Sequence, residues 1–261
     1  MQNSITFLGT GTSQGVPVIG CNCPVCRSAD PRDKRLRTAA LVRYQGKSFV
    51  IDAGPDFRQQ MLREGVERPD AILLTHSHID HTGGLDDVRA FNYTWRDGYR
   101  AAHPFPIYCE ERVQRSLRRQ FYYAFSTHLY PGIPQFDLHT ITEEPFEAAG
   151  VEIIPIRAMH YKLPVLGFRF GTLAYITDAN RIPESEFEKL RDLDILVLNT
   201  VRREKHISHF SLPEAVAVAE RIGARETRLT HLSHQLPCFA DLSAELPSNI
   251  QPAFDGLTLN F

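Results

Sequence analysis

Short apolar runs recur along the whole chain between polar, glycine-containing turns, a pattern that predicts strands with helices between them. In the first half we expect a helix at 57–64 and strands at 4–9, 39–44, 48–51 and 70–74. A glycine turn at 45–47 makes the second and third of these strands a hairpin. The second half repeats the pattern, with helices at 183–190 and from Ser211 onward, and strands at 151–156, 166–170, 173–176, 195–198 and 227–229. No low-complexity linker divides the chain, so we expect one domain over residues 1–261.

The segment 91–136 between the two halves is rich in aromatic and arginine side chains, and we expect it to be an insertion. A strand at 106–108 and a helix at 110–120 are predicted inside it. The aromatic side chains could form a substrate wall or the face of a homodimer. The alternative, which we prefer, is an added layer of core whose helix turns a basic face to solvent.

One polar stretch follows directly on the apolar run 71–74, and its sequence is Thr75-His76-Ser77-His78-Ile79-Asp80-His81. Side chains two positions apart at a strand end point the same way, so His76 and His78 can reach one ion. As the chain turns toward a helix expected from about 82–84, Asp80 and His81 are directed at a second point. Imidazoles and carboxylates are ligands of first-row metals, and two ions about 3.5–4 Å apart form a hydrolytic site. A polar loop that happens to be rich in histidine is the alternative, but four ligand-type residues within six positions favour the metal site.

Three more ligand-type residues follow predicted strands: His160, Asp178 and His231. Their recurrence at strand ends is what a site at one edge of a sheet requires. Asp52 also follows a strand, where it could be a further ligand or, as we prefer, an acceptor that orients the histidine loop.

The cysteines suggest a second, separate metal site. Cys21, Cys23 and Cys26 cluster within six positions, one thiolate short of a tetrahedral structural zinc site, so the fourth ligand must come from elsewhere. We expect Cys109 and Cys238 to be ordinary thiols and the charged stretch 27–37 to be a solvated loop. The glycines at 9–15 do not fit a dinucleotide fingerprint, because no helix follows them; they would let backbone approach the site.

Charge and composition remove other classes of function. The formal net charge is −2, so nothing indicates a nucleic-acid coat or an anionic membrane partner. The chain begins without a basic region and an apolar core typical of a signal peptide, and contains no apolar run that could span a bilayer. We therefore expect a soluble cytoplasmic protein.

The order His76-Ser77-His78-Ile79-Asp80-His81, then His160, Asp178 and His231, resembles the metallo-β-lactamase superfamily. Thr10-Gly11-Thr12 and Ile51-Asp52-Ala53-Gly54 match it as well, so the resemblance covers nearly the whole chain. The cysteine cluster and Leu229-Thr230-His231-Leu232-Ser233-His234 are most similar to the phosphoribosyl 1,2-cyclic phosphate phosphodiesterases of the carbon–phosphorus lyase pathway. The resemblance implies an α/β fold, the four-layer αβ/βα sandwich of that superfamily.

The same resemblance implies roles for the individual residues. One catalytic ion would be bound by His76, His78 and His160, and the other by Asp80, His81 and His231, with Asp178 bridging both. A hydroxide between the two ions would attack a small, cyclic phosphodiester. Asp80 would serve this open site, and His209, which we prefer to His206, would assist the leaving group. The structural zinc would be held by Cys21, Cys23, Cys26 and His234.

Three other functions stay open. A tRNA 3′-processing endonuclease shares the metal pattern, but we find neither its Gly- and Lys-rich arm nor a basic footprint. A carbonyl hydrolase, such as a lactonase, β-lactamase or thioesterase, would not typically carry the cysteine site. A non-catalytic metal-binding protein would have no use for an open metal position. The sequence does not choose between zinc and manganese, nor does it define the natural substrate.

Overall fold

Two seven-stranded mixed sheets form the frame of the computed structural model, which describes residues 2–96, 99–126 and 132–261. The strands of the first sheet, in spatial order, are β16 (Thr258–Asn260), β1 (Ser4–Gly9), β2 (Ala39–Tyr44), β3 (Lys47–Ile51), β4 (Ala71–Leu73), β7 (Phe105–Cys109) and β8 (Phe136–Thr140). Those of the second are β15 (Ile250–Pro252), β14 (Glu226–Thr230), β13 (Ile195–Asn199), β12 (Leu173–Ile176), β11 (Leu163–Phe170), β10 (Val151–His160) and β9 (Phe146–Ala148).

The inner faces of the two sheets pack against each other and form the central core. Phe49 and Leu73 of the first sheet belong to one buried cluster with Phe168 and Tyr175 of the second. Side chains alternate along each strand, so Ile72, between two inward-facing residues of β4, belongs to an apolar cluster on the outer face. Each sheet is therefore apolar on both faces, so its outer face needs a layer of helices in addition to the sheet that packs on its inner face.

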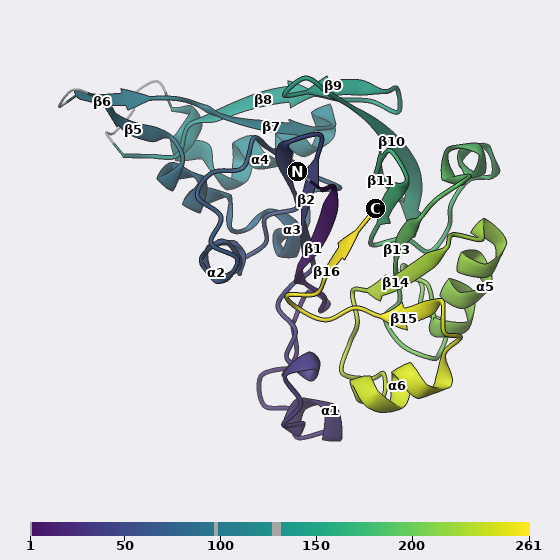
Figure 1. Ribbon diagram of the computed structural model, residues 1–261. Helices are drawn as coiled ribbons and strands as arrows, with labels where there is room; N and C mark the ends of the chain where they lie inside the picture. Colours follow the sequence, from purple (N-terminus) through teal and green to yellow (C-terminus); the bar gives the residue numbers. More distant parts are fainter. Residues whose placement is uncertain (1, 97–98, 127–131) are drawn as a thin grey trace.

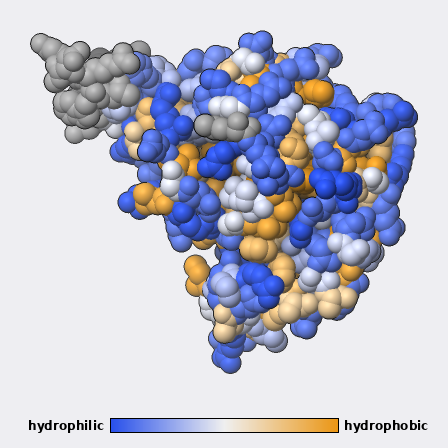
Figure 2. All heavy atoms as spheres, viewed as in Figure 1, coloured by the Kyte–Doolittle hydropathy of each residue, from blue (hydrophilic) through white to orange (hydrophobic). Residues whose placement is uncertain are grey.

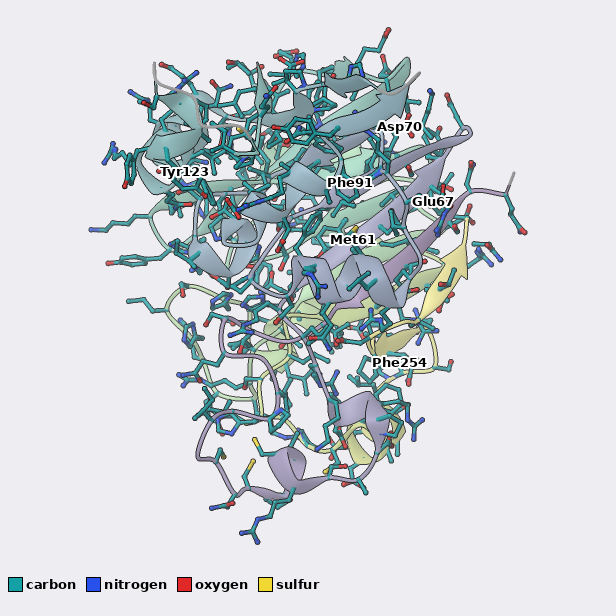
Figure 3. All side chains as sticks on the ribbon, turned by 90° about the vertical axis from the view of Figure 1, so that its left-hand side faces the viewer. Met61, Glu67, Asp70, Phe91, Tyr123 and Phe254 are labelled. Carbon is teal, nitrogen blue, oxygen red and sulfur yellow. The ribbon has the colours of Figure 1, made fainter. Side chains whose placement is uncertain are left out.

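Helices cover both outer faces (Figure 1). The first sheet packs against α2 (Phe57–Arg63), η2 (Leu85–Ala90) and α4 (Glu111–Gln120); Met61 and Phe91, labelled in Figure 3, lie in this layer. The second sheet packs against η4 (Glu184–Leu190), α5 (Leu212–Ile222) and α6 (Phe239–Glu245). The order helix, sheet, sheet, helix confirms the four-layer α/β sandwich.

Local sequence signals decide several element ends. Gln45 and Gly46 both have positive φ, 50° and 76°, as a two-residue hairpin turn requires between β2 and β3. Helix α5 begins with a capping box in which Ser211 and Glu214 bond reciprocally, and it ends at Gly223 in a left-handed conformation. The predicted hairpin and helix start are thus confirmed.

Other local predictions need correction. The helix expected from about 82–84 is the 3-10 helix η2, which starts after Gly84, but a further short helix, α3 (Ile79–Thr82), already begins inside the histidine motif. The helix predicted at 183–190 is a 3-10 helix. The strand at 227–229, predicted to be the last, is followed by α6, β15 and β16. Strands β15 and β16 have three residues each and are too short to show an alternating pattern. The strand that starts at Val151 continues to His160 instead of ending at 156.

The charged stretch 27–37 is not a solvated loop. Asp33 is fully buried and Arg35 is 3% exposed, and their charged atoms lie 3.6 Å apart. Asp33 also accepts a hydrogen bond from the backbone N–H of Phe239, and Arg35 donates one to the carbonyl of Ala253. The stretch therefore joins the cysteine loop to the C-terminal part of the chain, a use of charge that composition does not reveal.

Much of the segment 91–136 belongs to the sandwich. Strand β7 pairs in parallel with β4, while Val113 and Leu117 of α4 are buried and Arg115 is exposed. These contacts support the interpretation as core with a basic outer face. A two-stranded ribbon of β5 (Tyr93–Arg96) and β6 (Tyr99–Ala102) is set apart from both sheets. The side chains of Trp95 and Tyr99, and residues 127–131, lie outside the described part, and the homodimer stays a prediction.

Among the described residues, no helix combines the length and the apolar character needed to cross a membrane. On the face drawn in Figure 2, apolar residues lie in small patches among hydrophilic ones.

Candidate metal centre

The predicted ligands converge because strands from both sheets end at the same place. His76 lies three residues beyond β4 of the first sheet. In the second sheet, His160 is the last residue of β10, and Asp178 and His231 follow β12 and β14. Strands β12, β13 and β14 run parallel, so their carboxyl ends share one edge. The topology thus brings together residues up to 155 positions apart (231 − 76).

Four overlapping groups of facing ligand atoms from the described residues meet at this edge, and three of them contain Asp178. His76, His78 and His160 form the first group, in which His76 Nε2 lies 2.9 Å from His78 Nδ1. Asp80, Asp178 and His231 form the second. Asp178 Oδ2 is 3.3 Å from His231 Nδ1 and 3.2 Å from His81 Nε2, and Asp178 also groups with His76 and His81. All seven predicted ligands of the dinuclear site are therefore close together, with Asp178 in the middle.

The donor atoms fit divalent metal ions. His81 Nε2 and His231 Nδ1 are buried and face carboxylate oxygens, yet neither makes a hydrogen bond. Unpaired buried nitrogens are rare in folded proteins unless they bind something. Imidazole nitrogens beside carboxylates are the donors that zinc and manganese accept.

Asp52 holds the histidine loop in place and is not part of these groups. Its fully buried carboxylate accepts hydrogen bonds from the Thr75 N–H at 2.9 Å and the Thr75 hydroxyl at 2.9 Å, and contacts His81 Nδ1 at 2.7 Å. With Nδ1 donating to Asp52, the His81 Nε2 atom is left to face Asp80 and Asp178. The arrangement agrees with the orienting role preferred from the sequence.

Asp52, Asp178 and His231 also share an unusual backbone conformation, with φ of 63°, 55° and 58°. Non-glycine residues seldom adopt positive φ, and such strain gathers at functional sites. The tight turns after β3, β12 and β14 are what direct these three side chains into the centre.

The buried imidazole of His81 and the carboxylate of Asp178 shift each other's pKa. Burial opposes charge on the His81 imidazole, but Asp178 and Asp52 outweigh it and raise the pKa of His81 well above its usual value. Burial likewise opposes the Asp178 carboxylate, but His231 and His81 hold its pKa well below the usual range. A metal ion competes with protons for these ligands, so its affinity falls as the pH falls.

His209 belongs to one of these groups, with His160 and Asp178, whereas His206 is one layer further out. The His209 ring stacks on that of His231 with centroids 4.8 Å apart, and its Nδ1 is 3.8 Å from Asp178 Oδ1. Burial, aided by the charge of His231, lowers the pKa of His209 to about 3. The His206 ring is 5.1 Å from that of His209, and its Nδ1 contacts the hydroxyl of Ser208.

Residues missed by the sequence analysis support the loops around the centre. The Thr75 hydroxyl lies between Asp52 and His76 Nδ1, which is 2.9 Å away. The glycine loop approaches the His231 turn, as expected: the Leu232 N–H donates to the Thr10 carbonyl at 2.8 Å. Thr75 could have been found from its place directly before His76 in the motif, since a polar residue at a buried strand end needs a partner.

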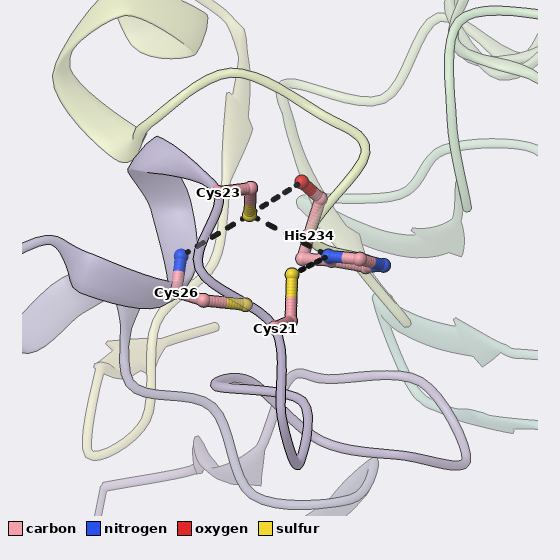
Figure 4. Close-up of side chains that lie close together, drawn as sticks. All are labelled: Cys21, Cys23, Cys26 and His234. Carbon is pink, nitrogen blue, oxygen red and sulfur yellow. Dashed lines mark hydrogen bonds between the residues drawn. The ribbon is translucent and has the colours of Figure 1, made fainter.

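The cysteine cluster gathers around His234 (Figure 4). His234 Nδ1 lies 3.2 Å from Cys21 Sγ and 3.5 Å from Cys23 Sγ, and Cys26 completes a group of four facing ligand atoms. The N–H of Cys26, at the start of α1 (Pro24–Arg27), donates to Cys23 Sγ and is the main reason that the Cys23 pKa falls to about 6. Three sulfurs and one nitrogen suit tetrahedral zinc.

Comparison with known proteins matches the part of the chain that carries the seven predicted ligands of the dinuclear site. A sequence profile of the "Beta-lactamase superfamily domain" matches residues 47–232, more than two thirds of the chain. The chain belongs to this superfamily. The solved structure of a new diphosphatase from the PhnP family is 42% identical, with a TM-score of 0.91, and the match covers 100% of this chain and 98% of that one. The family prediction is confirmed, and the superfamily member described here is similar to the PhnP branch.

Other relatives extend the comparison. An "Octanoyltransferase" of Porphyromonas gingivalis is 41% identical over 254 residues, 96% of this chain but 50% of that protein. A "Coenzyme PQQ synthesis protein B" of Rhodopseudomonas palustris is 33% identical over 55% of this chain and 46% of its own. The chain thus spans about half the length of these curated relatives. Zinc-bound PqqB from Methylobacterium extorquens, 20% identical with a TM-score of 0.77 over 99% of this chain and all of that one, shares the fold.

Replacing Asp52 by asparagine tests its hold on the histidine loop. Asp52→Asn keeps the shape but removes the charged acceptor that orients His81, so metal affinity should fall about 10–100-fold. Competition with a chromogenic chelator measures this. Asp70→Asn is the matched control, because Asp70 accepts from the Ser48 N–H and hydroxyl at the opposite end of β4. Equal affinity losses in the two variants would contradict the role of Asp52.

Proposed function

We propose that this superfamily member is a metal-dependent phosphodiesterase that acts on small, preferably cyclic, substrates. The observation that carries the proposal is Asp178, which is shared between groups of facing ligand atoms directly beside His209. Two such groups around one carboxylate suit the paired-metal chemistry of phosphoryl transfer. Similarity to a diphosphatase supports a second substrate class, because each phosphorus of an esterified diphosphate also carries two bridging oxygens.

In this proposal His76, His78 and His160 hold one ion, and Asp80, His81 and His231 hold the other, with Asp178 between them. Two zinc or manganese ions bound there would acidify water and neutralise charge on the phosphoryl oxygens. Neighbouring residues of the chain orient the ligand side chains. Asp52 orients His81, and the carbonyl of Ser208, 2.8 Å from His160 Nδ1, orients the ring of His160.

His209 serves the leaving group. When the phosphorus–oxygen bond breaks, the departing oxygen keeps the electron pair and needs a proton or a hydrogen bond. The His209 ring is 4.5 Å from that of His160 and 4.8 Å from that of His231, so it borders both proposed ion positions. Its side chain keeps 12% exposure, enough to meet a bound substrate.

The substrate class is tested with a panel on the metal-loaded chain. A cyclic phosphodiester or an esterified diphosphate should be hydrolysed much faster than a phosphomonoester, a lactone, a β-lactam or a precursor tRNA. A lactone hydrolysed far faster than any phosphodiester would make the substrate class wrong.

The Asp80→Ala variant should lose most turnover, because Asp80 serves only the catalytic metal site. Its circular dichroism spectrum should show an intact fold.

Substrates with graded leaving groups test His209. With poor alkoxide leaving groups, His209→Ala should lower kcat by about 10²–10⁴-fold, whereas an activated nitrophenyl ester needs little assistance and should lose little. His139→Ala, on strand β8 and 40% exposed, is the control and should change neither rate. Equal losses on both kinds of substrate would move His209 to substrate binding or packing.

The cysteine cluster supports a third ion with a structural role. We propose that Cys21, Cys23, Cys26 and His234 bind one zinc ion that takes no part in hydrolysis. His234 is three residues after His231, so this zinc would tie the first loop of the chain to the loop that carries a catalytic ligand.

Metal analysis and melting test this site. Fully loaded protein should contain about three ions per chain, one of which resists mild chelation. Cys23→Ser should lower the melting temperature and zinc retention more than the rate of the chemical step. Cys238→Ser is the control, because Cys238 packs beside the cluster but is not one of its four facing ligands. An unchanged melting temperature in Cys23→Ser would leave the cysteines as plain thiols.

A further inference from the structure

A pocket of about 400 Å³ opens next to the metal centre and has no part in the function proposed so far. We call it the outer pocket; its walls include Tyr161, Asn180, Arg181, Lys205, His206 and Ile207. They come from three segments, one directly after β10, one after β12 and one between β13 and α5. These segments also carry His160, Asp178 and His209, so the outer pocket and the metal centre share their supports.

Hydrogen bonds hold these walls in a fixed arrangement. Asn180 Oδ1 accepts from the Tyr161 N–H at 2.9 Å, and Asn180 Nδ2 donates to the Ile207 carbonyl at 2.9 Å. The Met159 N–H donates to the Arg181 carbonyl at 2.8 Å, next to His160. One side chain, Asn180, thus joins all three segments two residues beyond Asp178. A pocket fixed in this way loses little entropy when it binds a ligand.

The outer pocket carries two cationic side chains that form no close ion pair among the described residues. Among the ion pairs of the described residues, none involves Arg181 or Lys205, and both are exposed. Glu214 is the carboxylate on the pocket wall, but it is already bound to the N–H and the hydroxyl of Ser211 in the capping box. The charge of Lys205 already acts on Glu214, but Arg181 and Lys205 have no close ion-pair partner among the described residues and still favour an anionic ligand, above all a phosphate.

The outer pocket also offers apolar surface that faces solvent. Tyr161 is 50% exposed and Ile207 is 66% exposed, both unusual for large apolar side chains of this protein. Tyr161 has a φ of 57°, a conformation that non-glycine residues adopt at a cost. The ring therefore lies exposed at the pocket because the backbone turns there directly after His160. The Lys162 ammonium lies over the ring, 5.4 Å from its centroid, which leaves the other face as a platform on which a planar base can stack.

We propose that the outer pocket binds the nucleotide part of an esterified diphosphate, with the base on Tyr161 and its phosphate beside Arg181 and Lys205. This inference rests on the proposed function and names its substrate class. Water adds to the phosphorus at the metal centre, and the bond from that phosphorus to the bridging oxygen breaks. The bridging oxygen leaves with the electron pair on the nucleoside monophosphate and is protonated, so one water yields two phosphomonoesters. His206, 5.1 Å from His209 between ring centroids, lies on the path between the two sites.

Two substrates separate the outer pocket from the metal centre. Diadenosine diphosphate reaches both sites, whereas ribose 1,2-cyclic phosphate, with no base and no second phosphate, needs the metal centre alone. Tyr161→Ala should lower kcat/KM for diadenosine diphosphate about tenfold, through KM, and leave the cyclic substrate nearly unchanged. Tyr161→Phe keeps the ring and should behave like the unaltered chain. The double change Arg181→Ala and Lys205→Ala should also raise KM for diadenosine diphosphate about tenfold.

The matched control for the charge change is Arg225→Ala, whose side chain is 65% exposed just before β14, at the end of that strand opposite His231. Calorimetric titration with adenosine monophosphate gives a second readout, and its affinity should fall in Tyr161→Ala but not in Tyr161→Phe. Hydrolysis of the cyclic substrate without action on diadenosine diphosphate, or equal losses on both in Tyr161→Ala, overturns the inference and leaves the phosphodiesterase standing. If neither substrate is hydrolysed, the proposed function fails, and the titration alone decides whether the outer pocket takes a nucleotide.

Discussion

The buried carboxylate of Asp52 is the constraint on which the metal centre depends. A carboxylate without exposure is too costly to leave unpaired, so the chain must supply donors to it. It does so with the N–H and hydroxyl of Thr75 and with Nδ1 of His81. These contacts fix the turn after β3 to both ends of the histidine motif. They also leave His81 Nε2 directed at Asp178, so one buried charge sets the position of the whole motif.

Backbone contact around Asp52 leaves little freedom for this arrangement. A Cβ on Gly54 would lie 2.0 Å from the carbonyl oxygen of Asp80, and one on Gly84 would lie 2.1 Å from that of Gly54. The turn after β3 therefore touches both sides of α3, and only glycine permits the approach. The second sheet brings Asp178 and His231 to the same point from separate strand ends. The centre is thus rigid because its parts are fixed to two packed sheets, independently of any single loop.

The sequence predicted those features that are local. The strand ends, the hairpin at Gln45 and Gly46 and the capping box at Ser211 all follow from neighbouring residues, and the spacing of the ligand-type residues led to the site. Features that depend on distant contacts were missed. Asp33 and Arg35 resemble surface charges until Phe239 and Ala253, more than two hundred positions away, satisfy them. Asn180 joins Tyr161 to Ile207 in the same hidden way, and strands of three residues are too short to carry a pattern.

The loops at this edge serve two sites at once, because successive residues leave the backbone in different directions. His160 faces the metal centre and Tyr161 the outer pocket; His209 and His206 divide in the same manner. His231 and His234 lie three positions apart, one in the centre and the other in the cysteine cluster. The two sites share backbone supports, since Ser208 follows Ile207 of the pocket, but the ligand rings themselves are oriented by Asp52 and by the Ser208 carbonyl. Under the proposed function, changes at Tyr161, Arg181 or Lys205 would therefore alter substrate preference without replacing a ligand of the metal centre.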